Sequence, residues 1–451
     1  MLIILSDLHL TDGTCGVSIS PDAFYVFTER LDEMAMRASW REDGSYQPID
    51  EIKILLLGDI LDPLHSTLWL DTEPGMPEYT RPWTDRSKPQ YSHKLDQIVD
   101  AIIEKNAESL AVLRNIKVKI PRELESQRNW RDIGDIVDVP VYLYYTIGNH
   151  DWYFGIPGAR FDEIRTKIVD ALGLSQSNTP FPYAPEENED IEAMLDDYRV
   201  YAIHGDRFDT FNFDPSQQGR VHSSLGDVFT VEMLNRFPLE VARQLPELPN
   251  KVIDNLRELS HVRPALATSL WISSQIKHNN LPDETQTQIK KIWEQMGAEF
   301  LALDVVRSYD KSYNFDSVDK LEIAFTISKI ASFQTINDIA LWVQEKVWGG
   351  TISYAERALE EEAFKSKRAN YIVYGHTHHY ELKPLDTQET GDQLDDQIYF
   401  NSGTWQKFFD LAVNKPYDQK FVPYQVSTYL LFYKDGERRG HKFETLSATF
   451  S

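Results

Sequence analysis

Five short apolar runs, each followed within two residues by aspartate, asparagine or histidine, constrain the fold of this chain most strongly. The runs cover residues 2–5, 52–57, 139–147, 199–203 and 371–374. Continuous apolar runs of this length are typical of strands buried on both faces of a sheet. Helical spacing of apolar residues fills much of the chain between them, as at Leu95, Ile98 and Ile102. The sequence therefore predicts an α/β (α+β) fold, with polar side chains beyond the strand ends, where such sheets place their ligand sites.

The residues after these runs are of the types that bind divalent metal ions. Carboxylate oxygen, amide oxygen and neutral imidazole nitrogen together suit ions that handle phosphate. One such motif carries little weight, because an Asp-x-His triplet is expected about once by chance in a chain of this length. All of them in this order, each at a strand end, predict one shared metal site. The candidate ligands are Asp7, His9, Asp59, Asn149, His204, His376 and His378.

Two stretches look like insertions into the unit that carries these motifs. The chain from 211 to 368 shows few clear strands and much helical pattern, so we expect a helical insertion or cap there. A second insertion is expected at about 63–139. The catalytic domain would then consist of residues 1–210 and 369–451. Four tryptophans of the larger insertion are predicted to form its own core: Trp271, Trp293, Trp342 and Trp348.

Local signals within and beside the larger insertion give two further expectations. Ser353 and Glu356 have the spacing of a capping box, so a helix is predicted from there to about Lys367. The acidic stretch 186–197 follows three prolines and is predicted to be a solvated loop.

The charge balance and the single cysteine exclude several classes of protein. The chain has 46 Lys and Arg against 71 Asp and Glu, a formal net charge of −25, which opposes generic binding to nucleic acids or anionic membranes. Cys15 alone permits no intrachain disulfide, which fits a reducing compartment. The N-terminus has no basic region, and no apolar run approaches 18 residues. We therefore expect a cytoplasmic protein without a membrane span.

Taken together, the motifs resemble those of the calcineurin-like metallophosphoesterases. The likeness extends from residue 7 to about 404, where Asn401-Ser402-Gly403-Thr404 is similar to a turn that many members carry, and it leaves out both insertions. The resemblance implies a four-layer α-β-β-α sandwich with two divalent ions at one edge. Manganese is the first expectation for their identity, and iron, zinc and magnesium are alternatives.

The resemblance also implies how the ligands divide and which residues act on the substrate. Asp7, His9, Asp59 and His378 would hold the first ion. Asp59, Asn149, His204 and His376 would hold the second, with Asp59 bridging the two. His150 would be the general acid or a donor to the transition state, and Asp62 would orient it. Arg207 could pair with a substrate phosphate or form a structural salt bridge.

A phosphohydrolase is the function that this pattern favours. It would cleave a phosphoester or pyrophosphate bond of a small or medium substrate, such as a nucleotide, by attack of a hydroxide shared by the two ions. Asp62-Pro63 and Asp151 stand where protein Ser/Thr phosphatases have arginine and glutamate, so that branch is a poor fit and a bacterial-type member is expected. The first alternative is a DNA-end nuclease of the repair type, which the acidic balance opposes. The second is a non-catalytic scaffold, which the seven retained ligands oppose.

Overall fold

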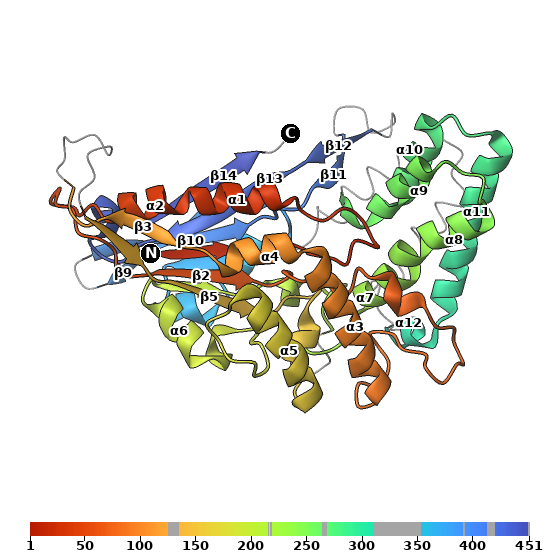
Figure 1. Cartoon of the computed structure of the whole chain (residues 1–451), viewed down its shortest axis with the longest axis horizontal. Helices are drawn as coiled ribbons and strands as arrows, with labels where there is room; N and C mark the ends of the chain where they lie inside the picture. The colour runs from red at the N-terminus through yellow and green to blue at the C-terminus, as the bar shows by residue number, and fades with distance from the viewer. Residues whose placement is uncertain are drawn as a thin grey trace.

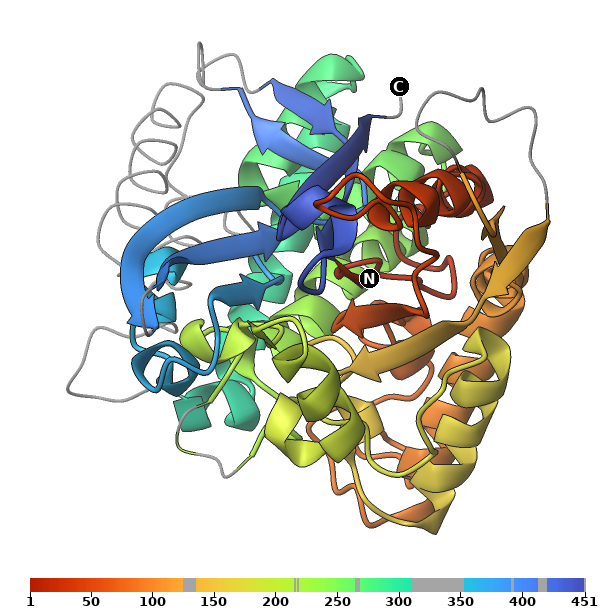
Figure 2. The same cartoon turned by 90° about the vertical axis from the view of Figure 1, so that its left-hand side faces the viewer.

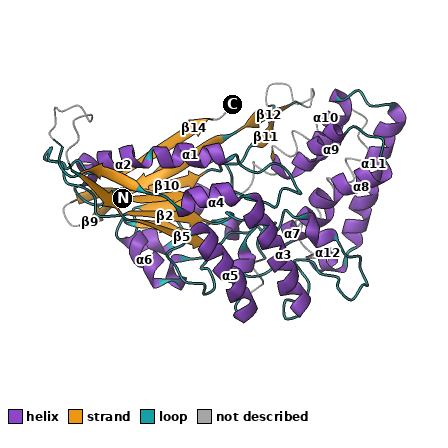
Figure 3. Ribbon diagram, viewed as in Figure 1, coloured by secondary structure: helices purple, strands orange, loops and turns teal. Residues whose placement is uncertain are grey.

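Two mixed sheets form the centre of the molecule (Figures 1 and 3). The computed structural model describes residues 1–124, 135–214, 216, 219–263, 268–309, 353–390, 393–412 and 420–449. In the first sheet the order is β14-β13-β1-β2-β5, and the last three strands are parallel. Its strands are β1 (Leu2–Leu5), β2 (Ile52–Leu57), β5 (Val141–Thr146), β13 (Val426–Phe432) and β14 (Phe443–Thr449).

The second sheet has the order β6-β8-β10-β9, and β6, β8 and β10 are parallel. Its strands are β6 (Val200–Ala202), β8 (Tyr371–Tyr374), β9 (Tyr380–Thr390) and β10 (Gln393–Ser402). Figure 2 looks along the molecule from the end opposite helices α8 to α11 and shows N-terminal strands beside C-terminal ones. Residues far apart in sequence therefore meet, as where Ile3 of β1 pairs with Leu431 of β13.

The alternation of side chains along the strands explains how the two sheets pack. Leu2, Ile4 and Leu55 of the first sheet share a buried core with Val373 and Phe400 of the second. The side chains between them point the other way and pack on helices, since successive residues of a strand face opposite sides. Because both faces are covered, the parallel strands read as continuous apolar runs.

Helices cover the outer face of each sheet. On the first sheet Ile3 and Ile54 pack in one core with apolar residues of α1, α2, α3, α4 and α5. On the second, Ile372 shares a core with Ala355 and Phe364 of α15 and α16. The helices are α1 (Pro21–Glu29), α2 (Leu31–Ala38), α3 (Pro89–Lys105), α4 (Ala107–Arg114), α5 (Ala159–Leu172), α15 (Tyr354–Ala358) and α16 (Glu362–Lys365).

A group of helices stands at one end of the molecule, at the right of Figure 1. Trp271 and Trp293 lie in its own apolar core, together with Phe237 and Phe300. Trp342 and Trp348 lie outside the described residues. The members are α7 (Leu225–Phe229), the π-helix η5 (Thr230–Asn235), α8 (Arg236–Gln244), α9 (Asn250–Arg257), α10 (Thr268–His278), α11 (Asp283–Ala302) and α12 (Asp304–Tyr309).

Two small sheets complete the described structure. One has the order β12-β11-β7 and joins the helical group to the C-terminal part of the chain. Its strands are β7 (Val262–Arg263), β11 (Phe408–Leu411) and β12 (Phe421–Tyr424). The other is the hairpin of β3 (Val118–Pro121) and β4 (Ile136–Val139).

Two local predictions need correction. The acidic stretch predicted as a solvated loop contains the helix α6 (Glu189–Asp196), whose Ile191, Met194 and Leu195 are buried. The side chain of Asn188 caps this helix by accepting from two backbone N–H groups. The capping box at Ser353 is confirmed, but its helix ends at Ala358 and α16 follows as a separate turn. Within the described ranges, no helix has both the length and the apolar composition needed to cross a bilayer.

Candidate metal centre

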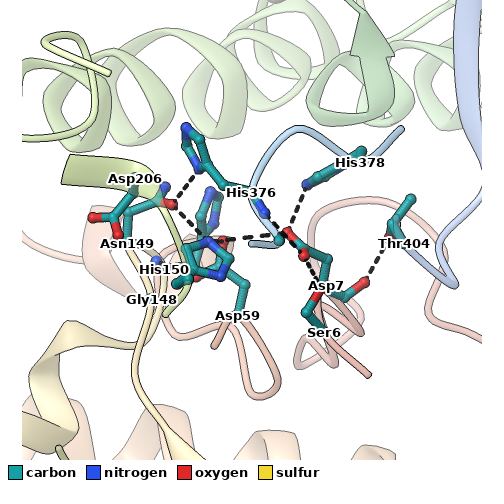
Figure 4. A network of polar contacts seen from close by, with 12 residues as sticks. Ser6, Asp7, Asp59, Gly148, Asn149, His150, Asp206, His376, His378 and Thr404 are labelled. Carbon is teal, nitrogen blue, oxygen red and sulfur yellow. Dashed lines mark hydrogen bonds and ion pairs between the residues drawn. The ribbon is translucent and has the colours of Figure 1, made fainter. Parts of the chain in front are cut away.

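The predicted ligands meet at the edge where the parallel strands of both sheets end. Figure 4 labels five of them, namely Asp7, Asp59, Asn149, His376 and His378. Asp7 and His9 follow β1, Asp59 follows β2 and Asn149 follows β5. His204 follows β6 of the second sheet, and His376 and His378 follow β8. All seven side chains come together there, because parallel strands in each sheet end at the same edge and the two sheets face one another.

The first cluster consists of Asp7, His9 and His378, whose ligand atoms lie within 4.8 Å of one another. Nε2 of His378 is 3.3 Å from Oδ1 of Asp7. Nε2 of His9 is 3.0 Å from Nε2 of His378 and 3.8 Å from the same Asp7 oxygen. The other ring nitrogen of His9, Nδ1, lies 2.8 Å from Oδ2 of Asp62 and donates to it. That bond leaves the Nε2 lone pair of His9 directed into the cluster.

The second cluster consists of Asp59, His204 and His376, with Asn149 beside it. Nε2 of His204 lies 3.1 Å from Oδ2 of Asp59 and 3.2 Å from Oδ1 of Asn149. Nδ1 of His204 donates to the carbonyl of Leu57 at 3.0 Å, so Nε2 is the nitrogen directed at the cluster. His376 places Nδ1 2.9 Å from Oδ1 of Asn149.

Asp59 lies between the two clusters. Its Oδ2 is 3.1 Å from Nε2 of His204 and 3.9 Å from Nε2 of His9. Its Oδ1 accepts from the backbone N–H of His150 at 2.8 Å. One carboxylate therefore faces an imidazole of each cluster and also fixes the loop that carries Asn149.

The buried polar atoms fit bound divalent cations. Oδ1 of Asp7 is buried and has no hydrogen-bond partner among the described residues, although three imidazole nitrogens lie within 4.0 Å of it. An unpaired buried carboxylate oxygen costs about 1–3 kcal/mol or more. The carboxylate, amide and imidazole groups around this oxygen are ligands of the kinds that bind divalent ions. These buried His and Asp groups could hold metal ions.

The backbone is strained at five of the candidate ligands. Asp7, His9, Asp59, His376 and His378 all have positive φ, between 44° and 67°. Each such residue costs about 1–3 kcal/mol, and conformations of this kind persist at functional sites because the surrounding structure over-determines them. In each Asp-x-His or His-x-His pair, both residues adopt this conformation and direct their side chains into the site.

Two glycines allow the ligands to approach the backbone. A Cβ atom on Gly148 would lie 2.3 Å from Oδ1 of Asp59 and 2.6 Å from the ring of His204. A Cβ on Gly375 would lie 2.6 Å from Oδ2 of Asp7. No side chain fits at either position without displacing a ligand.

Asp62 connects His150 to the first cluster. Oδ2 of Asp62 is 3.0 Å from Nδ1 of His150 and 2.8 Å from Nδ1 of His9. The predicted contact between Asp62 and His150 is therefore present. The side chain of His150 is 14% exposed, whereas that of His9 is 6% exposed, so His150 is the more accessible ring.

The charges of the site shift its pKa values strongly. Burial alone would lower the pKa of His9, but hydrogen bonds to Asp62 and Asp7 raise it to about 10. Burial likewise opposes the charge of His204, but Asp59 and Asp7 raise its pKa to about 10. Burial would raise the pKa of Asp7, yet His204 and His378 hold that pKa well below its usual range. The site therefore favours ionised aspartates and positively charged imidazoles over their neutral forms.

Arg207 contacts a carboxylate outside the two clusters. Its guanidinium pairs with Glu361, which also accepts from the hydroxyl of Tyr374 at 2.6 Å. The structural salt bridge considered from the sequence describes this contact, and the described geometry gives no support to a phosphate contact.

Three residues of the site were not assigned a role from the sequence. Oδ2 of Asp209 lies 3.2 Å from Nε2 of His376 and so orients that ring. Asp151 is fully buried, and its carboxylate accepts from the hydroxyl of Tyr145 at 2.6 Å, which fixes the loop after β5. His65 is a third imidazole on Asp62. Only their closeness in sequence to a motif, as with Asp209 five residues after His204, could have drawn attention to them.

Comparison of the chain with protein-family models and with curated proteins finds no match.

Proposed function

We propose that this chain is a two-metal phosphohydrolase of the calcineurin-like metallophosphoesterase type. The observation that carries the proposal is the pairing of the two clusters, Asp7/His9/His378 and Asp59/His204/His376, across one shared carboxylate. The order of layers, helices on a sheet facing a second sheet under helices, agrees with the sandwich that the motifs imply.

The positions of the ligands support a division between two ions. Asp7, His9 and His378 would hold the first ion, and Asn149, His204 and His376 the second, with Asp59 contributing to both. Two divalent ions at such a site lower the pKa of a bound water and offset the charge that develops on a phosphoryl group. The bonds from Nδ1 of His9 to Asp62 and from Nδ1 of His204 to the carbonyl of Leu57 aim the Nε2 atom of each ring at its cluster.

His150 would act on the substrate rather than on a metal ion. Its Nδ1 donates to Asp62, and Nε2 lies on the opposite side of the ring, directed away from that carboxylate. A proton on Nε2 can then be given to the leaving oxygen while Asp62 stabilises the charged ring. General acid assistance of this kind is typically worth about 10²–10⁴-fold in rate.

The helical group would restrict access of substrates to this edge. It contacts the loop after β2 through Asn235, whose Nδ2 donates to the carbonyl of Leu64 at 2.9 Å. It contacts the loop after β5 through Asp227, which accepts from Nε1 of Trp152 at 2.9 Å. These are the loops that carry Asp62 and His150, which supports a role as a cap over a small or medium phosphorylated substrate.

Metal reconstitution followed by a substrate panel tests the proposal. The chelated protein would be loaded with manganese, iron, zinc or magnesium, and its bound metal counted by mass spectrometry. It would then be given aryl phosphate mono- and diesters, nucleotide pyrophosphates and single-stranded DNA. We expect two ions per chain and hydrolysis of a small phosphoester or pyrophosphate. Preferential cleavage of DNA would favour the nuclease alternative, and a folded protein that binds two ions without hydrolysing any substrate would favour the scaffold.

A further inference from the structure

The clearest feature outside the ligand set is a second histidine beside the general acid. We infer that His65 is a positioning residue, which holds the carboxylate of Asp62 and thereby sets the orientation of His150. The inference rests on the proposed function, because it assigns a purpose to His65 within the same reaction. Neither the metal ligands nor the proton donor of that proposal includes His65.

His65 holds both oxygens of Asp62. Its backbone N–H donates to Oδ1 at 3.0 Å, and its ring nitrogen Nδ1 donates to Oδ2 at 2.7 Å. Two donors from one residue fix the rotation of the carboxylate about its own axis. With that rotation fixed, Oδ2 faces His9 and His150, whose Nδ1 atoms lie 2.8 and 3.0 Å away.

The ring of His65 also packs on the ring of His150. The two centroids are 5.0 Å apart and the planes differ by 22°, so the rings are stacked. The ring of His9 meets that of His150 edge-on, at 4.7 Å and 87°. His150 therefore has one imidazole against its face, another at its edge and a carboxylate oxygen at Nδ1, which leaves Nε2 as the free end of the ring.

Neighbouring contacts keep His65 itself in place. The residue before it, Leu64, accepts at its carbonyl from Nδ2 of Asn235 in the helical group. The residue after it, Ser66, begins the short 3₁₀-helix η1 (Thr67–Leu70) and caps it by accepting from Leu68. The side chain of His65 is only 9% exposed. Because the residues before and after His65 are both fixed, its ring has a defined position from which to orient the carboxylate of Asp62.

The second ring nitrogen of His65, Nε2, makes no contact with the described residues that would explain a histidine at this position. Nε2 is buried and has no hydrogen-bond partner within the described part of the chain. A buried ring nitrogen without a partner costs about 1–3 kcal/mol of stability. An apolar residue of similar size would avoid this cost, so the structure retains the imidazole for the bond that Nδ1 makes to Asp62.

Two substitutions at His65 separate this bond from simple packing. In His65→Asn the amide nitrogen reaches the place of Nδ1 and preserves the bond to Asp62. In His65→Phe the aromatic face against His150 is preserved and the bond is lost. His93→Ala is the matched control, because His93 lies on the exposed face of α3, where it hydrogen-bonds to Gln97. Folding would be checked by thermal melting, and metal content by mass spectrometry.

The kinetic readout is the dependence of kcat on the leaving group. Paired phenyl and p-nitrophenyl esters would be used, because phenolate needs a proton from His150 more than p-nitrophenolate does. We expect His65→Phe to lower kcat about tenfold on the phenyl ester and less than about threefold on the p-nitrophenyl ester. His65→Asn should stay near wild type on both esters, as should His93→Ala. Equal losses on both esters, or a His65→Asn variant as slow as His65→Phe, would overturn the inference.

A spectroscopic readout keeps the test independent of activity. With ¹⁵N-labelled histidine, and the signal of His150 identified by its loss in His150→Ala, the position of the ring proton can be followed directly. In its neutral form, the ring of His150 should carry its hydrogen on Nδ1 in wild type and His65→Asn, and should be a mixture of tautomers in His65→Phe. An unchanged signal in His65→Phe, or a third bound ion that His65→Phe removes, would contradict the role. If wild type with two ions hydrolyses nothing, the proposed function fails, yet this comparison still tests whether His65 holds His150.

Discussion

Nε2 of His9 and Nε2 of His378 lie 3.0 Å apart, although 369 residues separate them in the chain. The ring of His9 donates through Nδ1 to Asp62, so its Nε2 presents a lone pair. A second imidazole nitrogen and the unpartnered Oδ1 of Asp7 face that lone pair at close range. Three basic atoms gathered around one point repel each other unless a proton or a cation lies among them, so the arrangement supports a metal ion at this position.

Asp59→Asn should remove most bound metal and nearly all activity. Its carboxylate lies between the clusters, and an amide in its place removes one negative charge and offers only one oxygen. The two oxygens of Asp59 also serve different partners, His204 and the backbone of His150. The measurement is metal content by mass spectrometry, with circular dichroism to confirm the fold. Two retained ions in Asp59→Asn would show that Asp59 is not shared between the sites.

His150→Ala should keep both metal ions and lose about 10²–10⁴-fold in kcat. The Nδ1 atom of His150 is engaged by Asp62, and its side chain groups with His9, Asp62 and His65 rather than with the two clusters that Asp59 connects. The loss should be larger for substrates with poor leaving groups. Loss of metal in a folded His150→Ala variant would instead make this imidazole a ligand and would refute the role assigned to it.

The strands that carry the ligands were predictable because burial on both faces leaves a simple pattern. β1, β2 and β8 match their predicted runs residue for residue. The predicted run 139–147 is divided at Pro140, which cannot donate to a ladder, so β4 ends before it and β5 begins after it. The closeness of the candidate ligands was predictable because each of them lies one to four residues after one of these runs.

Other parts of the structure depend on contacts that the sequence does not display. Seven acidic residues between 186 and 197 concealed the helical pattern of Ile191, Met194 and Leu195 in α6, which share one core with residues of both sheets. The strand β11 lies between β12 and β7, and its pairing with β7 joins it to a segment far away in the chain. The roles of His65 and Asp209 follow from the positions of Asp62 and His376 after folding. No local spacing specifies them.

Gly148→Ala should disrupt the centre by steric collision alone. The new Cβ would lie 2.3 Å from Oδ1 of Asp59, well inside contact distance, so that carboxylate or the ring of His204 must move. We expect weaker metal binding and at least about tenfold lower activity, as shifts of about 1 Å in such sites typically cost even more. Gly75→Ala is the control: nothing lies within 4 Å of its Cβ, so its positive φ should lower stability by about 1 kcal/mol without affecting metal. Equal metal affinity in Gly148→Ala and wild type would contradict this close packing.

Metal binding at neutral pH should release protons. The pKa values of His9 and His204 are raised to about 10, so both rings are protonated at neutral pH in the metal-free protein. A metal ion that binds Nε2 of either ring must displace a proton from it. Metal ions and protons therefore compete for the same atoms, and apparent metal affinity should fall as pH falls from about 10 towards neutrality. Titration of the chelated protein with manganese at pH 7.5, in weak buffer with an indicator, should release about two protons per chain from these rings. The His204→Gln variant should release about one proton fewer, and the control His93→Ala should release as many as wild type. An equal proton count in His204→Gln and wild type would rule out His204 as a source of released protons.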